Sequence, residues 1–270
     1  MTRLMVTAAV ALAIGAGAVP AGAVAGHAVG PRKVLVVTHT TGFRHTEGIE
    51  AGEKAMREIG ERSGAFSVDY CRTADDVKAM LTPSGLDPYA AVVFLNTTGD
   101  LGIPDLPAFL DWIKSGKGFL GMHSATDTYH DQSTYIDMIG GEFETHGQQA
   151  EVEPIVNDKR HPATRRWPAG FRILDEIYHH RHFDRARVHV LLSLSSVPDD
   201  RSATANQPAD FPLAWCKPYG KGRVFYTAFG HRGDVWTNEV YRQHVLGAVR
   251  WALGLDRASV KLGNPAPAAR

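Results

Sequence analysis

The 270-residue chain has only two cysteines, no excess of charge of either sign and, beyond its first 25 residues, no apolar run of transmembrane length. Lys plus Arg and Asp plus Glu number 29 each, and no basic run occurs. Neither nucleic acid nor a membrane surface is therefore expected as a partner of the mature chain. No G-x-G-x-x-G follows the first predicted strand and no Walker sequence occurs, which argues against a nucleotide cofactor.

The two cysteines, Cys71 and Cys216, each lie in an apolar, strand-like run. They could pair in an exported protein, but separate buried thiols are the favoured interpretation. Neither has the glycine-flanked strand-to-helix turn, or the neighbouring histidine, that would activate a thiolate. A cysteine nucleophile is therefore not expected.

The two ends of the chain differ in composition from the rest. Residues 1–25 are predicted to be a signal peptide, since Arg3 is their only charge, Met5 to Ala18 are small or apolar, and Ala21-Gly22-Ala23 fits a cleavage site. A retained anchor helix is the alternative. We therefore expect a secreted or extracytoplasmic protein, with no membrane contact after cleavage, and a flexible tail over residues 255–270.

Apolar strands alternate with helices in the first half of the chain. The predicted strands are Lys33–Thr38, Phe66–Cys71, Ala90–Leu95 and one that begins at Gly118, and the predicted helices are Thr46–Arg62, Asp75–Leu81 and Pro104–Ser115. Fully apolar strands joined by such helices require a parallel sheet that is covered on both faces. The pattern predicts an α/β fold, specifically a flavodoxin-like three-layer α/β/α sandwich.

The pattern changes after Gly141. Glu151–Val156 and His189–Leu194 are predicted strands without clear helices between them, which indicates an inserted antiparallel portion. Parallel order resumes with a strand at Gly222–Ala228 and a closing helix at Asn238–Leu253. One domain over residues 32–254 is expected.

Three of the thirteen histidines directly follow predicted strands of the parallel sheet. His39 follows the first strand, His123 the strand from Gly118, and His231 the late strand. Because the carboxyl ends of parallel strands share one edge of a sheet, we expect these imidazoles to meet in one pocket. They are candidate ligands of a divalent metal such as zinc, and His123 and His231 are also candidate catalytic residues.

Other histidines have weaker contexts. His146 follows the Gly140-Gly141 pair and is a catalytic candidate, although a simple hairpin explains the glycines equally well. Arg44 and His45 lie in the loop after the first strand and are candidate substrate-binding residues. His130 and His161 are predicted to be loop residues, and His179, His180 and His182 to form a solvated strand end rather than a metal tract.

Carboxylates and aromatic residues complete the candidate set. Asp127 is predicted either to orient His123 or to cap its own turn. Glu176 is a candidate acid or base, or half of a buried ion pair with Arg44 or Arg223. The remaining substrate-binding candidates are Ser124, which sits in a weak match to a hydrolase elbow, Tyr178, and Trp215, which is either a sugar-stacking platform or a core residue.

Several motifs, in order, carry a family resemblance: VTHTTGFRH, GFLGMHSATDT, GGEFETHG, DEIY and PLAWCKPYGKGRVFYTAFGH. Over about Lys33 to Gly254 the chain resembles the ThuA-like, trehalose-utilisation family. That family is similar in fold to class I glutamine amidotransferases, and the resemblance places His123 where those enzymes have their nucleophilic cysteine. A glutaminase activity is therefore not expected.

The resemblance implies a small-molecule carbohydrate as ligand, because the family is associated with trehalose and related disaccharides, in part as oxidised 3-keto sugars. Our hypothesis is cleavage of a 3-keto glycoside. Glu176 or His146 would act as base, while His123 and His231, alone or through a metal, would stabilise an enolate oxygen. A non-catalytic sugar-binding accessory protein and a zinc hydrolase with another substrate are the alternatives.

Overall fold

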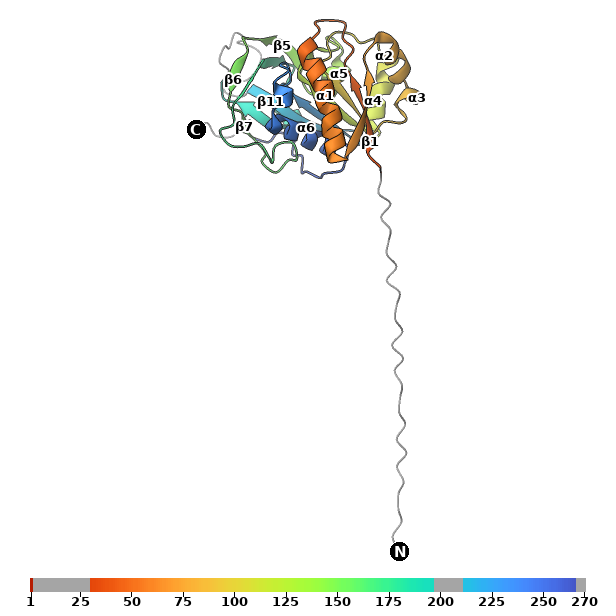
Figure 1. The fold of residues 1–270 in the computed structure, drawn as a ribbon, viewed down its shortest axis with the longest axis vertical. Helices are drawn as coiled ribbons and strands as arrows, with labels where there is room; N and C mark the ends of the chain where they lie inside the picture. Colours follow the sequence, from red (N-terminus) through yellow and green to blue (C-terminus); the bar gives the residue numbers. More distant parts are fainter. Residues whose placement is uncertain (2–29, 197–210, 266–270) are drawn as a thin grey trace. The chain divides into compact units, whose positions relative to one another are not determined.

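An eight-stranded mixed sheet lies at the centre of the fold (Figure 1). The computed structural model describes residue 1, residues 30–196 and residues 211–265, so the predicted signal peptide falls outside the described residues apart from Met1. The sheet order is β2-β1-β3-β4-β12-β11-β10-β7. These strands are β1 (Arg32–Val37), β2 (Phe66–Cys71), β3 (Ala91–Leu95), β4 (Gly118–Met122), β7 (Ile155–Val156), β10 (His189–Leu194), β11 (Phe211–Tyr219) and β12 (Gly222–Thr227).

The first five strands of this order are parallel, and the last three continue the sheet in antiparallel fashion. The parallel order is the flavodoxin-like one. Strands β3 and β4 are buried along their whole length, because helices cover both faces of the sheet. This is why their sequences show no polar alternation.

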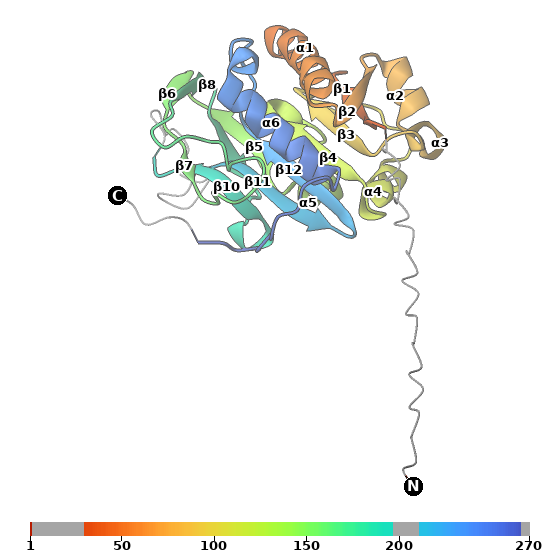
Figure 2. The ribbon, with the colours of Figure 1, turned by 60° about the horizontal axis from the view of Figure 1, so that its bottom comes forward.

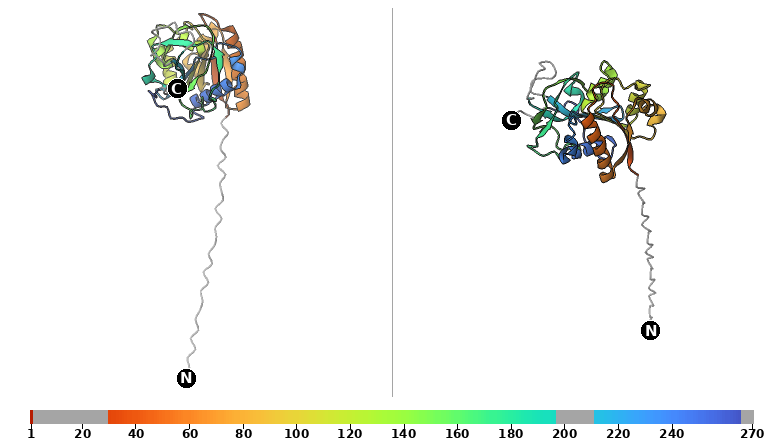
Figure 3. Two further views of the ribbon diagram at one scale, coloured as in Figure 1. Left: turned by 90° about the vertical axis from the view of Figure 1, so that its left-hand side faces the viewer. Right: turned by 45° about the horizontal axis from the view of Figure 1, so that its top comes forward.

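Helices cover the two faces of the sheet in two groups. One group is α1 (Thr46–Ser63) and α6 (Glu239–Ala252); the other is α2 (Ala74–Met80), α3 (Pro83–Leu86), α4 (Leu106–Lys114) and α5 (Ser133–Ile139). Each group packs on its own apolar core cluster. Figure 2 shows α1 and α6 on one face of the sheet with α4 and α5 beyond the other, and α1 and α6 stay side by side in Figure 3. The predicted three-layer sandwich is confirmed.

Local signals define several helix ends. Thr73 and Asp76 form a reciprocal capping box at the start of α2, and the Asp105 carboxylate accepts the Ala108 amide at the start of α4. Gly64 ends α1 and Gly140 ends α5, both in the left-handed conformation that glycine adopts at least cost.

The predicted antiparallel insertion is confirmed, with one error in detail. Besides β7 and β10, two small sheets pair β5 (Glu142–His146) with β9 (Tyr178–Arg181) and β6 (Ala150–Val152) with β8 (Ile173–Asp175). The single strand expected over Glu151–Val156 is wrong, because β6 and β7 belong to different sheets. Pro154 lies between them, and its missing N–H cannot support a continuous ladder.

Part of the expected flexible tail is ordered. The Asn264 amide donates to the Val190 carbonyl and its oxygen accepts the Val190 N–H, at 2.9 and 2.8 Å. The Gly263 N–H donates to the Val188 carbonyl. The tail is thus held against β10 and the residue before it as far as Asn264, which corrects the expectation of a flexible tail for this part of residues 255–270.

Both cysteines are buried and unpaired. Cys71 lies in β2 and Cys216 in β11, with four strands between them. Burial raises the pKa of Cys71 to about 12 and holds that of Cys216 well above its usual range, so neither thiol is a nucleophile. Within the described residues, no helix combines the length and the apolar character that a membrane span requires.

Candidate functional site

The site lies at the carboxyl edge of the parallel strands. Met122, the last residue of β4, pairs with Leu95 of β3 on one side and Thr227 of β12 on the other. The three strands therefore end at the same level, and the segments that follow them begin side by side. His123 follows β4 directly, and His231 lies four residues beyond β12.

His123 is the buried centre of the site. Its backbone has φ 48°, an uncommon value for a residue with a side chain, and its imidazole is fully buried. Nδ1 lies 2.8 Å from the Ala228 carbonyl oxygen, which can only accept, so Nδ1 carries the proton. The Tyr178 ring, 4.2 Å away between centroids, packs against the imidazole. In the neutral ring Nε2 therefore has a free lone pair.

That lone pair faces Glu176 and His231. His123 Nε2 lies 3.4 Å from Glu176 Oε2 and 3.2 Å from His231 Nδ1, and the latter two atoms lie 3.2 Å apart. Burial opposes ionisation of Glu176, but the adjacent His123 and His231 hold the pKa of its carboxyl well below its usual range. Burial likewise opposes a charge on His231, but Glu176 raises the pKa of that imidazole.

His45 closes the site from the side of α1. It is the residue before the first turn of α1, and its ring centroid lies 4.9 Å from that of His123 and 5.1 Å from that of His231. His45 Nδ1 lies 3.3 Å from Ser124 Oγ. Burial, followed by the two neighbouring imidazoles, lowers the pKa of His45 to about 3, so this ring is neutral at physiological pH.

The four side chains fit a divalent metal. One ligand atom from each of His45, His123, Glu176 and His231 lies within 4.8 Å of the other three. The triangle of His123, Glu176 and His231 has edges of 3.2 to 3.4 Å, and ligands held about 2.0–2.1 Å from a tetrahedral zinc ion lie about 3.3 Å apart. Three imidazole nitrogens and a carboxylate are also a donor set that zinc and similar ions accept.

The neighbouring Asp175 fixes the segment that carries His231. Asp175 is fully buried, and its carboxylate accepts the backbone N–H groups of Gly230, Glu176 and Arg232. Burial raises its pKa, against the opposing effect of His123. Asp175 thus organises the backbone on both sides of the centre and does not face the ligand triangle.

Gly48 allows α1 to pack against the segment that carries His231. A Cβ at Gly48 would lie 2.4 Å from Asn96 Nδ2 and 2.6 Å from the carbonyl oxygens of Gly230 and His231.

Gly48→Ala should therefore displace His231. We expect the free energy of unfolding to fall by about 1–3 kcal/mol, and the zinc affinity measured by calorimetry to fall at least tenfold. In Gly233→Ala the nearest atom is 3.5 Å away, and unchanged zinc affinity is expected. Equal zinc affinity in both variants would contradict this packing argument.

His146 lies at the exposed rim of the centre, at the end of β5. Its Nδ1 is 2.8 Å from the Gly147 carbonyl oxygen and 3.3 Å from Glu176 Oε1. Both neighbours are acceptors, so Nδ1 carries the proton and the free lone pair is on Nε2. The side chain is 42% exposed, which leaves His146 accessible to a ligand. Glu176 thus bridges the buried triangle and this exposed base.

Two candidates of the first loop lie apart from the four side chains. The expected meeting of His39 with His123 and His231 is wrong. The backbone N–H of His39 donates to the Cys71 carbonyl, on the β2 side of the sheet. Burial and the neighbouring Arg44 lower the pKa of His39. The Arg44 guanidinium donates to the Thr38 carbonyl. His45, from the same loop, stands where His39 was expected.

Other predictions need correction. Trp215 is fully buried and its indole donates to the Ile139 carbonyl, so it is a core residue and offers no face to a sugar. Glu176 pairs with histidines rather than with Arg44 or Arg223. His161 lies in a loop, as expected, although it is buried, whereas His179 and His180, expected at a solvated strand end, are buried instead.

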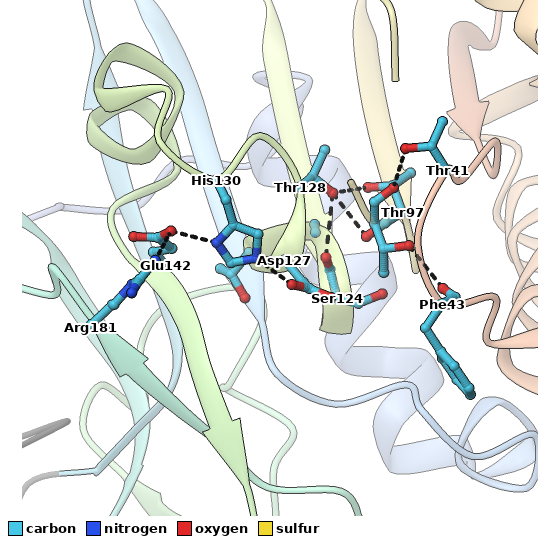
Figure 4. Close-up of polar contacts among 12 residues, drawn as sticks. Thr41, Phe43, Thr97, Ser124, Asp127, Thr128, His130, Glu142 and Arg181 are labelled. Atoms are coloured by element: carbon cyan, nitrogen blue, oxygen red, sulfur yellow. Dashed lines mark hydrogen bonds and ion pairs between the residues drawn. The ribbon is translucent and has the colours of Figure 1, made fainter. Parts of the chain in front are cut away.

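A second polar cluster, around Glu142, was not predicted. His130 lies between the carboxylates of Asp127 and Glu142 (Figure 4). Glu142 also accepts from Arg181 and His182, each at 2.7 Å. Burial opposes its ionisation, but these partners lower the pKa of Glu142 to about 2. Asp127 therefore anchors the turn after His123 to β5 and does not contact His123 itself.

Comparison with known proteins assigns the family. The sequence model of the ThuA family, described as trehalose utilisation, matches residues 33–252. The chain belongs to the ThuA family. This confirms the resemblance carried by the sequence motifs, and the ThuA match includes all four side chains of the proposed centre. Among proteins with curated functions, none matches this chain.

Solved structures agree with the ThuA fold. A ThuA-like protein from Parabacteroides merdae is 20% identical, with a TM-score of 0.67 over 88% of this chain and 94% of its own. One from Bacteroides uniformis is 24% identical, with a TM-score of 0.63 over 86% and 95%. A β-galactosidase from Rahnella sp. R3 is 13% identical, with a TM-score of 0.52 over 84% of this chain and 32% of that enzyme. These similarities concern the fold.

Proposed function

We propose that the chain is a metal-assisted enzyme that cleaves 3-keto glycosides at the His45–His123–Glu176–His231 centre. The observation that carries the proposal is the ligand triangle, in which His123 Nε2, Glu176 Oε2 and His231 Nδ1 converge at 3.2 to 3.4 Å with an exposed base beside them. Membership of the trehalose-utilisation family supports a carbohydrate substrate.

The four side chains would hold a divalent ion, and the local structure orients one of the ligand atoms in advance. The Ala228 carbonyl fixes the His123 tautomer with Nε2 directed at the centre. Glu176 contributes the negative charge that balances part of the ion's charge. Such an ion would supply a Lewis acid that attracts the ketone oxygen of the substrate.

His146 is positioned to act as the base. The ketone at C3 of an oxidised sugar makes the neighbouring C2 proton acidic, and His146 Nε2 would remove that proton. The C1–O bond then breaks as a double bond forms between C1 and C2. His146 returns its proton to the departing oxygen, so the products are a free sugar and an unsaturated ketone. Addition of water to that ketone would complete a hydrolysis.

Glu176 is the less suitable base of the two that the sequence suggested. Its carboxyl faces His123 and His231 through one oxygen and His146 through the other, and these partners keep its pKa well below the usual range. A carboxylate this weakly basic is better suited to hold a cation and to orient His146 than to remove a carbon-bound proton.

Incubation of the purified protein with 3-keto-trehalose and with ordinary trehalose tests the proposal. We expect release of glucose from the 3-keto sugar alone, with loss of activity in a chelator and recovery on adding zinc or manganese. Ordinary trehalose is the matched control, because it lacks the ketone that acidifies C2. Absence of turnover of the 3-keto sugar with every metal tried would overturn the proposed reaction.

Export stays a prediction that accompanies this function. The predicted signal peptide over residues 1–25 would place the enzyme outside the cytoplasm. Expression of the full chain, followed by cell fractionation and N-terminal sequencing, is expected to yield a protein that begins near Gly26 outside the cytoplasm.

A further inference from the structure

Phe43 is an exposed aromatic side chain beside the proposed centre. Among the phenylalanines, tyrosines and tryptophans that the structure describes, it is the one that is exposed, with 68% of its surface accessible. All other described phenylalanines, tyrosines and tryptophans are buried or partly buried. Single exposed apolar side chains are common on protein surfaces, and what sets Phe43 apart is its position beside the buried side chains of the proposed centre.

The backbone of Phe43 is held in place. Thr98 Oγ1 donates to the Phe43 carbonyl at 2.9 Å, and the Thr41 N–H donates to the Thr98 carbonyl at 3.0 Å. Gly42 lies so close to Thr98 that an added Cβ would be 2.9 Å from its Oγ1. Figure 4 shows the Phe43 ring extending away from the threonines that hold this loop. The backbone that carries the ring is thus held in place by hydrogen bonds, which lowers the entropic cost of ordering this loop when a ligand binds.

The ring stands next to the catalytic imidazoles. Its centroid lies 4.8 Å from that of His45, and the two planes are nearly perpendicular at 79°. His45 is in turn 4.9 Å from His123 and 5.1 Å from His231, centroid to centroid. The Phe43 ring is therefore linked to His123 and His231 through a single intervening ring, that of His45.

We infer that Phe43 forms an aromatic subsite that stacks on the sugar unit adjoining the one that reacts. This inference rests on the proposed function, which places the oxidised ring at the His/Glu centre. The C–H face of a pyranose packs well on an aromatic ring. A disaccharide can then span the site, with its ketone at the centre and its leaving unit on Phe43. The subsite takes over the role that the sequence suggested for Trp215.

Kinetics of Phe43→Ala with two substrates tests the subsite. The variant should raise KM for 3-keto-trehalose about three- to tenfold, the range that a lost stacking contact predicts, and change kcat by less than twofold. Methyl 3-keto-glucoside has no second ring, so its KM should not change. Phe43→Tyr and Phe43→Trp should restore the KM for the disaccharide. Leu255→Ala, which removes an exposed apolar side chain elsewhere, is the matched control.

Calorimetry with ordinary trehalose separates this inference from the proposed reaction. Trehalose should bind the wild type and bind Phe43→Ala about three- to tenfold more weakly, whether or not 3-keto-trehalose is cleaved. Equal trehalose affinity in both proteins, or no trehalose binding to the wild type, overturns the subsite. Wild-type binding without any turnover supports the subsite and overturns the reaction instead.

Discussion

Glu176→Gln is expected to abolish turnover and to weaken zinc binding by at least 100-fold. Glutamine has the shape of glutamate but no charge, and its amide nitrogen cannot serve as a ligand. The substitution therefore removes the corner of the triangle at which Glu176 Oε2 lies 3.4 Å from His123 Nε2 and 3.2 Å from His231 Nδ1. It also removes the carboxylate that raises the pKa of His231, so His231 should titrate at lower pH in the variant.

Calorimetric zinc titration and turnover of 3-keto-trehalose measure these effects. Glu151→Gln is the matched control, because it makes the same chemical change at an exposed carboxylate that pairs with Arg172. The control should bind zinc like the wild type. NMR titration of the histidines supplies the shift of His231. Unchanged zinc affinity in Glu176→Gln would mean that the carboxylate is not a ligand.

Acidification from pH 7 to pH 5 is expected to remove several kcal/mol from the unfolding free energy of the chelator-treated protein. Four buried histidines are responsible, and in each burial is the main cause of a lowered pKa: about 3 for His45, His161 and His180 and about 4 for His244. Each binds a proton readily only after unfolding. As the pH drops below the unfolded pKa of about 6.5, the free energy of unfolding therefore decreases, and it goes on decreasing until the pH reaches the folded pKa. At pH 5 the loss is about 2 kcal/mol per histidine.

Two histidines act in the opposite direction. Burial opposes the charge of His130 and His231, but neighbouring carboxylates raise both pKa values. Their stabilising contribution to the free energy of unfolding is fully present below pH about 6.5 and is lost as the pH rises through the folded pKa. They offset part of the loss on acidification, and the four lowered groups outnumber them.

Urea unfolding at intervals between pH 5 and 7 measures the slope of stability against pH. His244→Asn keeps a donor for the Ala163 carbonyl, to which His244 Nδ1 now donates at 2.8 Å. Below pH 6, the slope of stability against pH should correspond to about one proton fewer taken up on unfolding in this variant than in the wild type. A stability that is flat across this range would show that the buried histidines are not held neutral by the fold.

The parallel half of the fold follows from the sequence because its strands are apolar throughout. A run such as Ala91–Leu95 is explained by burial on both faces, and that in turn requires helices on both sides. The convergence of His123 and His231 follows from the same reasoning, since β4 and β12 are parallel neighbours whose ends coincide. These parts of the site needed only local patterns and one rule of topology.

The rest of the site depended on features that local patterns do not contain. His39 comes two residues after the end of β1, but β3 separates β1 from β4, whereas the loop beyond His39 carries His45 back to the centre. Trp215 lies in β11 between two other strands, with its ring in the core. The link from Glu142 to His130 joins β5 to an irregular turn, and no periodicity marks such a contact.

Anomalous diffraction at the zinc absorption edge, from crystals of the full chain grown with zinc, shows directly whether the four side chains bind a metal ion. We expect one strong peak per chain, about 2.0–2.2 Å from His123 Nε2, His231 Nδ1 and Glu176 Oε2, with His45 as the nearest further ligand. A peak on other side chains, or density that shows the three atoms hydrogen-bonded with no ion between them, would contradict it.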